Sequence, residues 1–252
     1  MALVPSQLIV ALDHCDEQQS LLLIEELHAS GVTWFKVGLE LYTQAGPSIV
    51  QRLKDRGAHV FLDLKLYDIP NTVAQAVKAA AKTGADLLTV HCSGGVRMLE
   101  AAQEATKGTS LSLLGVTVLT SFGAEDFPGV AEAWGARSGA ALPRNAVAFN
   151  LAELAAQSGL PGIVCSVSDL HDGQLKKIKW RHASPRFVTP GIRNASDPAH
   201  DQKSVATVAQ AVQLGATHLV VGRPITNASD RKSAAKSFLE QIREAHVVTS
   251  HT

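Results

Sequence analysis

Eight short apolar runs recur along the chain, and amphipathic stretches with helical periodicity separate them. Strands that alternate with helices favour repeated βα units joined in a parallel sheet. Eight such units in roughly 250 residues are the size of a (β/α)8 barrel, so we expect an α/β fold. A doubly wound sheet is less favoured because no GxGxxG turn follows the first run. The runs are Leu8 to Asp13, Trp34 to Leu39, His59 to Leu66, Leu87 to Cys92, Leu113 to Leu119, Gly162 to Val167, Arg186 to Ile192 and His218 to Ile225.

The stretches between the runs are predicted to be helices. Several end close to a glycine, the residue that most readily takes the left-handed conformation after a helix. The Gly- and Ala-rich segment Phe122 to Arg144 has the weakest pattern, and we interpret it as a long connection that leads into a helix from about Asn145 to Gln157. We see no linker, so we expect one domain over residues 1–252. The clearest helices are Glu17 to Ser30, Pro47 to Arg56 and Asn71 to Lys82, and the closing glycines are Gly31, Gly57, Gly84 and Gly215.

Composition limits the kinds of partner. The chain carries 23 Lys and Arg against 23 Asp and Glu, and this balance does not favour nucleic-acid or membrane-surface binding. No apolar run approaches the roughly 18 residues that span a bilayer, and no secretory signal is present, so we expect a cytoplasmic protein. Cys15, Cys92 and Cys165 form no CxxC pair and are expected to be free thiols. His91 is a lone histidine, so we expect it to pack rather than to bind metal.

The most informative stretch runs from Phe61 to Thr72. Alternate side chains of a strand share a face, so Asp63 and Lys65 are expected on the face of Phe61 and Tyr67, with leucines on the other. An exposed ion pair is the simpler interpretation of Asp63 and Lys65 alone. However, Asp68 follows just beyond the strand, and this third charge favours chemistry at a C-terminal strand end, where barrels hold their active sites.

Polar residues also end most of the other predicted strands. Each alone could be a solvated loop residue, but their joint position predicts one site. Gly191 and Gly222 would free backbone N–H groups beside two arginines, which predicts an anion site where barrels commonly hold phosphate. The polar loop from Arg193 to Lys203 is long enough to fold over a ligand as a lid. The strand-end residues are Asp13, Lys36, Thr120, Ser121, Arg193 and Arg223.

Four segments carry a resemblance to a known family: Val10 to Asp13, the signature Asp63-x-Lys65-x-x-Asp68-Ile69-x-Asn71-Thr72, Thr189 to Arg193, and Gly222-Arg223. Over nearly its whole length the chain resembles orotidine 5'-phosphate decarboxylases of the bacterial type. A DxKxxD strand alone is shared with sugar-phosphate decarboxylases and synthases of the same suprafamily, whereas the full set is highly specific.

The resemblance implies decarboxylation of orotidine 5'-monophosphate to UMP, the last step of de novo pyrimidine synthesis, without metal or organic cofactor. It implies that Lys36, Asp63, Lys65 and Asp68 form an array of alternating charge beneath the pyrimidine C6, and that Lys65 protonates C6. It also implies a homodimer, in which Asp68 and Ile69 reach the neighbouring subunit's site. The residues implied to bind substrate are Asp13, Lys36, Asp63, Ile69, Thr72, Thr120 or Ser121 beside it, Arg193, Gln202, Gly222 and Arg223.

Two other functions stay open at this point. A magnesium-dependent 3-keto-gulonate 6-phosphate decarboxylase or hexulose-phosphate synthase of the suprafamily would carry a metal-binding acid at the end of the second strand, where this chain has Lys36. A pyrimidine-nucleotide binding barrel without turnover is the non-enzymatic alternative, and the presence of Lys65 argues against it.

Overall fold

The computed structural model describes residues 6–13, 15–122, 143–194 and 206–249. Its strands form a closed parallel barrel in chain order, which confirms the predicted (β/α)8 fold. The strands are β1 (Gln7–Ala11), β2 (Trp34–Val37), β3 (His59–Leu66), β4 (Leu87–His91), β5 (Ser112–Val116), β6 (Gly162–Val164), β7 (Arg186–Thr189) and β8 (His218–Val221).

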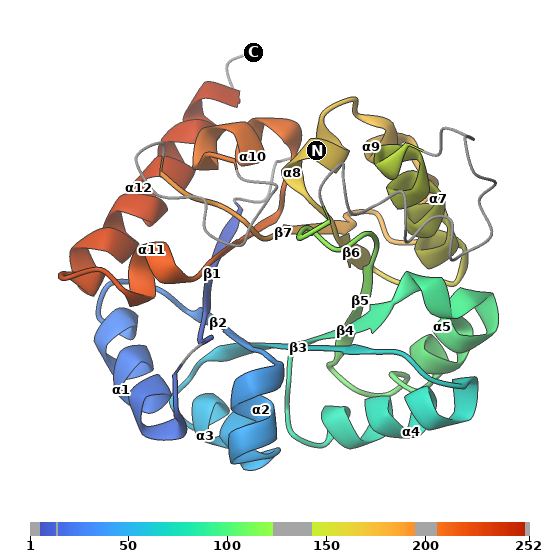
Figure 1. Cartoon of the computed structure of the whole chain (residues 1–252), viewed down its shortest axis with the longest axis horizontal. Helices are drawn as coiled ribbons and strands as arrows, with labels where there is room; N and C mark the ends of the chain where they lie inside the picture. Colours follow the sequence, from blue (N-terminus) through green and yellow to red (C-terminus); the bar gives the residue numbers. More distant parts are fainter. Residues whose placement is uncertain (1–5, 14, 123–142, 195–205, 250–252) are drawn as a thin grey trace.

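Helices surround this ring on all sides (Figure 1). Gly31, Gly57, Gly84 and Gly215 all have positive φ angles, as expected for glycines that close helices. No helix in the described ranges is long and apolar enough to cross a bilayer. The helices are α1 (Glu17–His28), α2 (Leu39–Ala45), α3 (Ser48–Lys54), α4 (Pro70–Ala81), the short 3-10 helix η1 (Cys92–Gly94), α5 (Gly95–Glu104), α7 (Arg144–Gln157), α8 (Val167–Leu170), α9 (Gln174–Lys177), α10 (Val208–Leu214), α11 (Arg223–Thr226) and α12 (Arg231–Thr249).

The strand predictions are right in number and order, but most predicted runs extend past the observed strand at the C-terminal end. The seventh strand ends at Thr189 because Pro190 has no N–H group to donate to the sheet. The eighth strand ends at Val221, and the residues from Arg223 form α11 instead. Of the apolar residues beyond these ends, Pro190, Ile192 and Pro224 line the mouth of the barrel, whereas Ile225 belongs to the main hydrophobic core.

The core has two layers, because alternate strand residues point to opposite sides of the barrel wall. Ile9, Phe61 and Leu114 belong to a small cluster inside the barrel. Val10 and Leu62, their neighbours in sequence, belong to the large cluster between strands and helices. The outer layer anchors the helices, and the inner layer fills the barrel below the C-terminal mouth.

Candidate active site

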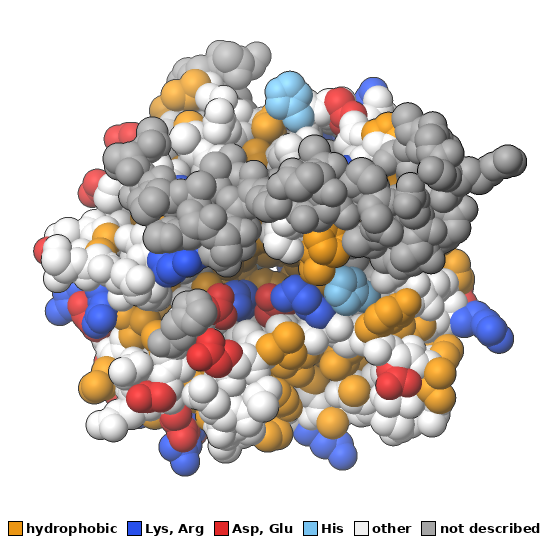
Figure 2. All heavy atoms as spheres, viewed as in Figure 1, with side chains coloured by type: hydrophobic (Ala, Val, Ile, Leu, Met, Phe, Trp, Pro, Cys, Tyr) orange, Lys and Arg blue, Asp and Glu red, His pale blue; other side chains and the backbone are white. Residues whose placement is uncertain are grey.

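A cavity of about 370 Å³ opens at the C-terminal ends of the strands. This volume is within the range of small-molecule sites in proteins. Figure 2 shows acidic and basic side chains gathered together in the hollow at the middle of this face. The predicted residues that line the cavity are Asp13, Lys36, Asp63, Lys65, Thr120, Ser121, Gly191, Arg193, Gly222 and Arg223.

Four of these side chains form a chain of alternating charge across β1, β2 and β3. Lys36 Nζ lies 2.6 Å from Asp13 Oδ1 and 3.9 Å from Asp63 Oδ2. Lys65 Nζ donates to the same Asp63 Oδ2 at 2.7 Å. The predicted proximity of Lys36, Asp63 and Lys65 is therefore confirmed. Within one chain, however, the fourth member of the array is Asp13.

Asp63 is the most enclosed carboxylate of this array, and its side chain is only 13% exposed. Burial alone would raise the pKa of its carboxyl group. The ammonium groups of Lys36 and Lys65, together with hydrogen bonds from Lys65 and Thr89, outweigh burial and hold this pKa below its ordinary value. Asp63 is therefore ionised at neutral pH, so the array keeps both of its Asp63 ion pairs there.

The end of β3 is distorted where it presents Lys65. Leu62 pairs with Leu88 and Leu66 with Val90, so β3 advances four residues while β4 advances two. Lys65 has a φ angle of 50°, and no other non-glycine residue in the described ranges has a positive φ. Left-handed backbone at such a residue costs on the order of 1–3 kcal/mol and is typical of functional sites. Phe61, Asp63 and Lys65 share the predicted face, but Tyr67 is exposed and does not line the cavity.

Sequence reasoning missed two residues that support the array. The buried Thr89 hydroxyl of β4 accepts from the Lys65 N–H at 2.8 Å and donates to Asp63 Oδ1 at 2.9 Å. A Cβ atom on Gly38 would lie 2.7 Å from Asp13 Oδ1 and 2.9 Å from Lys36 Nζ, so the absence of a side chain there makes room for that ion pair. Thr89 could have been noticed, because it is a lone hydroxyl in an apolar run and shares the parity of inward-facing Leu87.

The predicted phosphate end lies at the tips of β7 and β8. Gly191 has a φ angle of 80°, a left-handed turn that glycine adopts without strain. The next two residues run beside Ala206: Ile192 forms a bridge with it, and the Arg193 N–H donates to its carbonyl at 3.0 Å. The Arg193 side chain is buried and lines the cavity from the tip of β7, across the barrel from β3, which carries Lys65 and Asp63.

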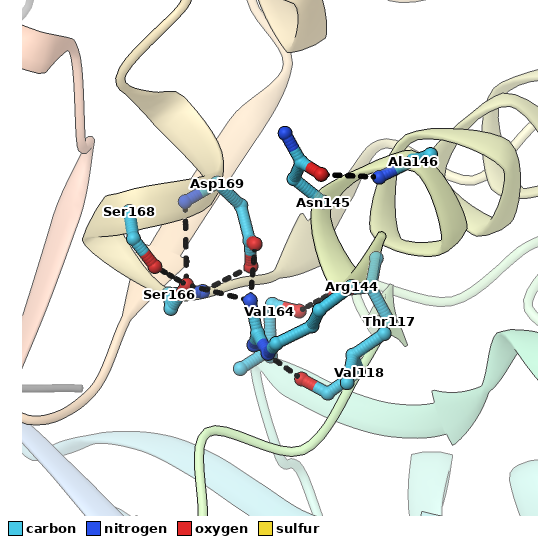
Figure 3. A network of polar contacts seen from close by, with 9 residues as sticks. All are labelled: Thr117, Val118, Arg144, Asn145, Ala146, Val164, Ser166, Ser168 and Asp169. Carbon is cyan, nitrogen blue, oxygen red and sulfur yellow. Dashed lines mark hydrogen bonds and ion pairs between the residues drawn. The ribbon is translucent and has the colours of Figure 1, made fainter. Parts of the chain in front are cut away.

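A polar network fixes the segment after β5 (Figure 3). Arg144, the first residue of α7, forms an ion pair with Asp169 of α8. The same guanidinium donates to the Val118 carbonyl at 3.4 Å and to Ser166 Oγ at 3.3 Å. The Asp169 side chain is 1% exposed and that of Arg144 is 18% exposed, so the contact is mostly shielded from solvent. The network therefore anchors the backbone just before Thr120 and Ser121, both of which line the cavity.

Asp68, Ile69 and Thr72 follow β3 in the sequence and are exposed, and they are not among the residues that line the cavity within this chain. Asp68 Oδ1 accepts the N–H of Ile69 at 2.6 Å. Gln202 and most of the proposed lid lie outside the described residues, as does most of the segment from Phe122 to Arg144. The helix predicted to follow that segment, from about Asn145 to Gln157, is present as α7.

His91 ends β4, close to the array. Burial and the positive charge of Lys65 lower the pKa of its imidazole, while Asp63 acts in the opposite direction. The ring contacts Tyr67, with 5.9 Å between ring centroids. Among the described residues, no group of three or more His, Cys, Asp or Glu side chains is arranged to hold a metal ion.

Comparisons with known proteins agree across nearly the whole chain. The sequence model of the orotidine 5'-phosphate decarboxylase / HUMPS family matches residues 6–238. The orotidine 5'-phosphate decarboxylase of Pseudomonas fluorescens (strain SBW25) is 40% identical over 245 residues, which are 96% of this chain and 100% of the relative. The crystal structure of orotidine 5'-phosphate decarboxylase from Lactobacillus acidophilus has a TM-score of 0.77 and 34% identity, covering 94% of this chain and 99% of that one. An uncharacterized conserved protein from Geobacillus kaustophilus has a TM-score of 0.75 and 36% identity, covering 93% of this chain and 99% of that one.

Proposed function

The chain belongs to the orotidine 5'-phosphate decarboxylase / HUMPS family, and from this premise we propose how its site converts orotidine 5'-monophosphate to UMP. The observation that carries the mechanism is the chain of alternating charges Asp13–Lys36–Asp63–Lys65 in the wall of the cavity. Lys65 is the positively charged end of this row of four side chains, and 32% of its side chain is exposed.

The reaction requires stabilisation of a carbanion. Loss of carbon dioxide leaves an electron pair at C6 in the plane of the pyrimidine ring, where the π system cannot delocalise it. The protein must therefore stabilise this charge electrostatically. We assign that role to the Lys65 ammonium, which then delivers its proton to C6, so that the C6–H bond of UMP forms as Lys65 becomes neutral.

The size of this effect can be estimated. One ammonium at about 4 Å from a unit negative charge contributes on the order of 4 kcal/mol at an effective dielectric near 20, or about three powers of ten in rate. Asp63 and Lys36 keep the ammonium in place before the charge develops, so little reorganisation is needed during the reaction. Further acceleration would come from binding energy at the remote phosphate.

The remaining cavity residues fit the rest of the nucleotide. We assign Arg193 and Arg223 to the phosphate, because a guanidinium donates two hydrogen bonds to one phosphate group. Gly222 leaves this end open, since a Cβ atom there would meet only Ala11, at 3.6 Å. Asp13 lines the cavity with its side chain 44% exposed, and we assign it to the ribose hydroxyls, with Thr120 or Ser121 in contact with the pyrimidine.

The magnesium-dependent alternative has less support. The family model spans both decarboxylases and HUMPS enzymes, but the relatives with 40% identity are named orotidine 5'-phosphate decarboxylase. Lys36 also brings a positive charge between Asp13 and Asp63, which disfavours a cation bound between these carboxylates. We expect EDTA to leave turnover unchanged, and loss of activity that magnesium restores would support the alternative.

We further propose a homodimer with shared sites. Exposed apolar side chains lie beyond the neighbouring strands β2, β3 and β4: Leu39 (56% exposed), Tyr67 (62%), Ile69 (67%) and Val96 (38%). Apolar groups gathered at one edge of a cavity are typical of an interface. Asp68 lies in the middle of this edge, where it could enter a partner's cavity. A cytoplasmic location is likewise a proposal, and it is supported by three cysteines that are all free thiols.

The mechanism is tested with Lys65→Ala. This change removes the proton donor and the nearest positive charge together, so we expect the rate of orotidine 5'-monophosphate consumption, followed by ultraviolet absorbance, to fall by about a thousandfold or more. Circular dichroism should remain native, because Lys65 is partly exposed and its replacement leaves the core intact. A folded Lys65→Ala variant that keeps more than a few per cent of the parent rate would rule out this mechanism.

A further inference from the structure

Thr89 lies inside the barrel wall, below the cavity rather than in its lining. Its hydroxyl group is fully buried and makes two hydrogen bonds, both to the proposed catalytic strand. It accepts from the Lys65 N–H at 2.8 Å and donates to Asp63 Oδ1 at 2.9 Å. A hydroxyl has one hydrogen to donate, and Asp63 receives it, so the direction of both bonds is fixed.

The first bond replaces a missing sheet contact. The register shift between β3 and β4 removes Lys65 from regular pairing, and its backbone takes the left-handed conformation. A buried N–H group without an acceptor is costly, so this conformation requires an acceptor from another element. Thr89 supplies that acceptor. The direction in which the Lys65 side chain leaves the strand therefore depends on Thr89.

The second bond orients the carboxylate beside Lys65. Thr89 holds Asp63 Oδ1 at the back of the site, which leaves Oδ2 between Lys65 at 2.7 Å and Lys36 at 3.9 Å. Without that hydrogen bond the carboxylate could rotate, and neither ammonium group would keep its position. A single hydroxyl thus controls the backbone of one charged residue and the side chain of the other.

We propose that Thr89 is a positioning residue of the decarboxylation, which sets the geometry of the Asp63–Lys65 pair without touching the substrate. This inference rests on the proposed function, because it concerns the same site. A hydroxyl with a purely structural role would affect the stability of the fold but not kcat, the rate at which bound substrate is converted. The two roles therefore differ in how kcat and KM respond.

The test compares Thr89→Val, which keeps the shape and removes the hydroxyl, with Thr89→Ser, which keeps the hydroxyl. We expect Thr89→Val to lower kcat by about tenfold or more with a smaller change in KM, because displaced supporting groups weaken transition-state contacts more than substrate binding. Thr89→Ser should keep kcat within a few fold of the parent. Thermal unfolding is measured for both variants.

Thr217→Val is the matched control. The Thr217 hydroxyl also accepts a backbone N–H from the neighbouring strand, that of Phe187 in β7 at 2.9 Å. Thr217 directly precedes β8, so it lies at the N-terminal end of the barrel strands, away from the cavity. This variant should lose stability and keep kcat. If Thr89→Val does not fold, Thr89→Cys is compared with Thr89→Ser instead. These two variants differ only in having a thiol or a hydroxyl, and a thiol is a weak hydrogen-bond donor and acceptor.

The outcomes are separable. A parent enzyme without turnover of orotidine 5'-monophosphate would refute the proposed function itself. With an active parent, the positioning role is wrong if Thr89→Val, or Thr89→Cys in its place, keeps kcat within about twofold. It is equally wrong if Thr89→Ser loses as much kcat as the variant without the hydroxyl, or if Thr217→Val loses as much as Thr89→Val.

Discussion

Gly38 lies beside the Asp13–Lys36 ion pair, and the two charged groups occupy the space that a side chain would need. Gly38→Ala would place a methyl group 2.7 Å from Asp13 Oδ1, so the carboxylate and the ammonium must move. Both are ends of flexible side chains, and the Gly38 φ angle of -92° suits alanine, so the cost in stability is small. We expect kcat/KM to fall by about 10- to 100-fold, because displacements near 1 Å have effects of this size.

The measurement is steady-state turnover together with a thermal melt of the parent and Gly38→Ala. A large loss of activity with an unchanged melting temperature would support the geometric role of the ion pair. If kcat/KM stays within about twofold of the parent, the Asp13–Lys36 distance does not limit catalysis.

The residue types predicted which charged side chains form the array better than they predicted the contacts between them. The sequence placed Asp63, Lys65 and Lys36 at the mouth, and the structure brings them together. The contact of Asp13 with Lys36 was not predicted, because different rotamers of the long Lys36 side chain would bring its ammonium group to either of the two carboxylates. The left-handed Lys65 was also missed, since the period-2 rule assumes a regular strand.

At the scale of elements, the Arg144–Asp169 ion pair joins α7 to α8 next to the segment after β5 (Figure 3). Asp169→Asn keeps the size of the side chain but removes the buried negative charge that faces the partly buried Arg144 guanidinium. We expect it to lower the free energy of unfolding by about 2 kcal/mol or more, because the partly buried Arg144 charge loses its partner. Urea denaturation measures this change.

Asp172→Asn is the matched control, because Asp172 is an exposed aspartate that accepts one backbone N–H, that of Gln174 at 3.1 Å. Its effect should stay below about 1 kcal/mol. Equal losses in the two variants would mean that the Arg144 contact contributes no more stability than a surface turn.

Element boundaries could be predicted where apolar pattern and sheet coincide. His59–Leu66 was predicted with the observed bounds. The predicted run Leu113 to Leu119 is too long, because Val118 and Leu119 are apolar for a different reason, namely that they line the cavity beyond the strand. Hydrophobicity alone cannot separate these two kinds of burial.

At the scale of the whole molecule, stability should depend on pH through His218 at the closed end of the barrel. Burial and the nearby charge of Arg186 lower the pKa of its imidazole from 6.5 to about 4. Between these values the unfolded chain binds the proton and the folded chain does not, so stability falls as the pH falls through this window. The loss by pH 4 is on the order of 3 kcal/mol.

His218→Gln isolates this contribution, since glutamine is neutral and similar in size. The difference in unfolding free energy between pH 7 and pH 4, measured in urea, should be smaller in this variant than in the parent. A His218→Gln slope equal to that of the parent would show that His218 does not titrate in this way.

The barrel could be predicted as a whole, because eight repeats of one unit allow few other closed arrangements. The complete site could not, because a single chain leaves Asp68 and Ile69 exposed and outside the lining of the cavity. Their predicted roles require a second copy, and no pattern in one sequence gives the geometry between two chains.

The shared site can be tested by complementation. If Asp68 serves the partner's cavity, Lys65→Ala and Asp68→Ala homodimers should each be nearly inactive, because every site lacks one charged group. In a mixed dimer one site carries both changes, while the other combines Lys65 of one chain with Asp68 of its partner. Two-fold symmetry makes this exchange reciprocal, so random mixing of equal amounts gives about half mixed dimers and roughly a quarter of the parent activity.

The two variants are tagged differently, mildly denatured and refolded together, and turnover is compared with each variant refolded alone. If mixed dimers are isolated through both tags and are no more active than the mean of the two controls, Asp68 acts within its own chain.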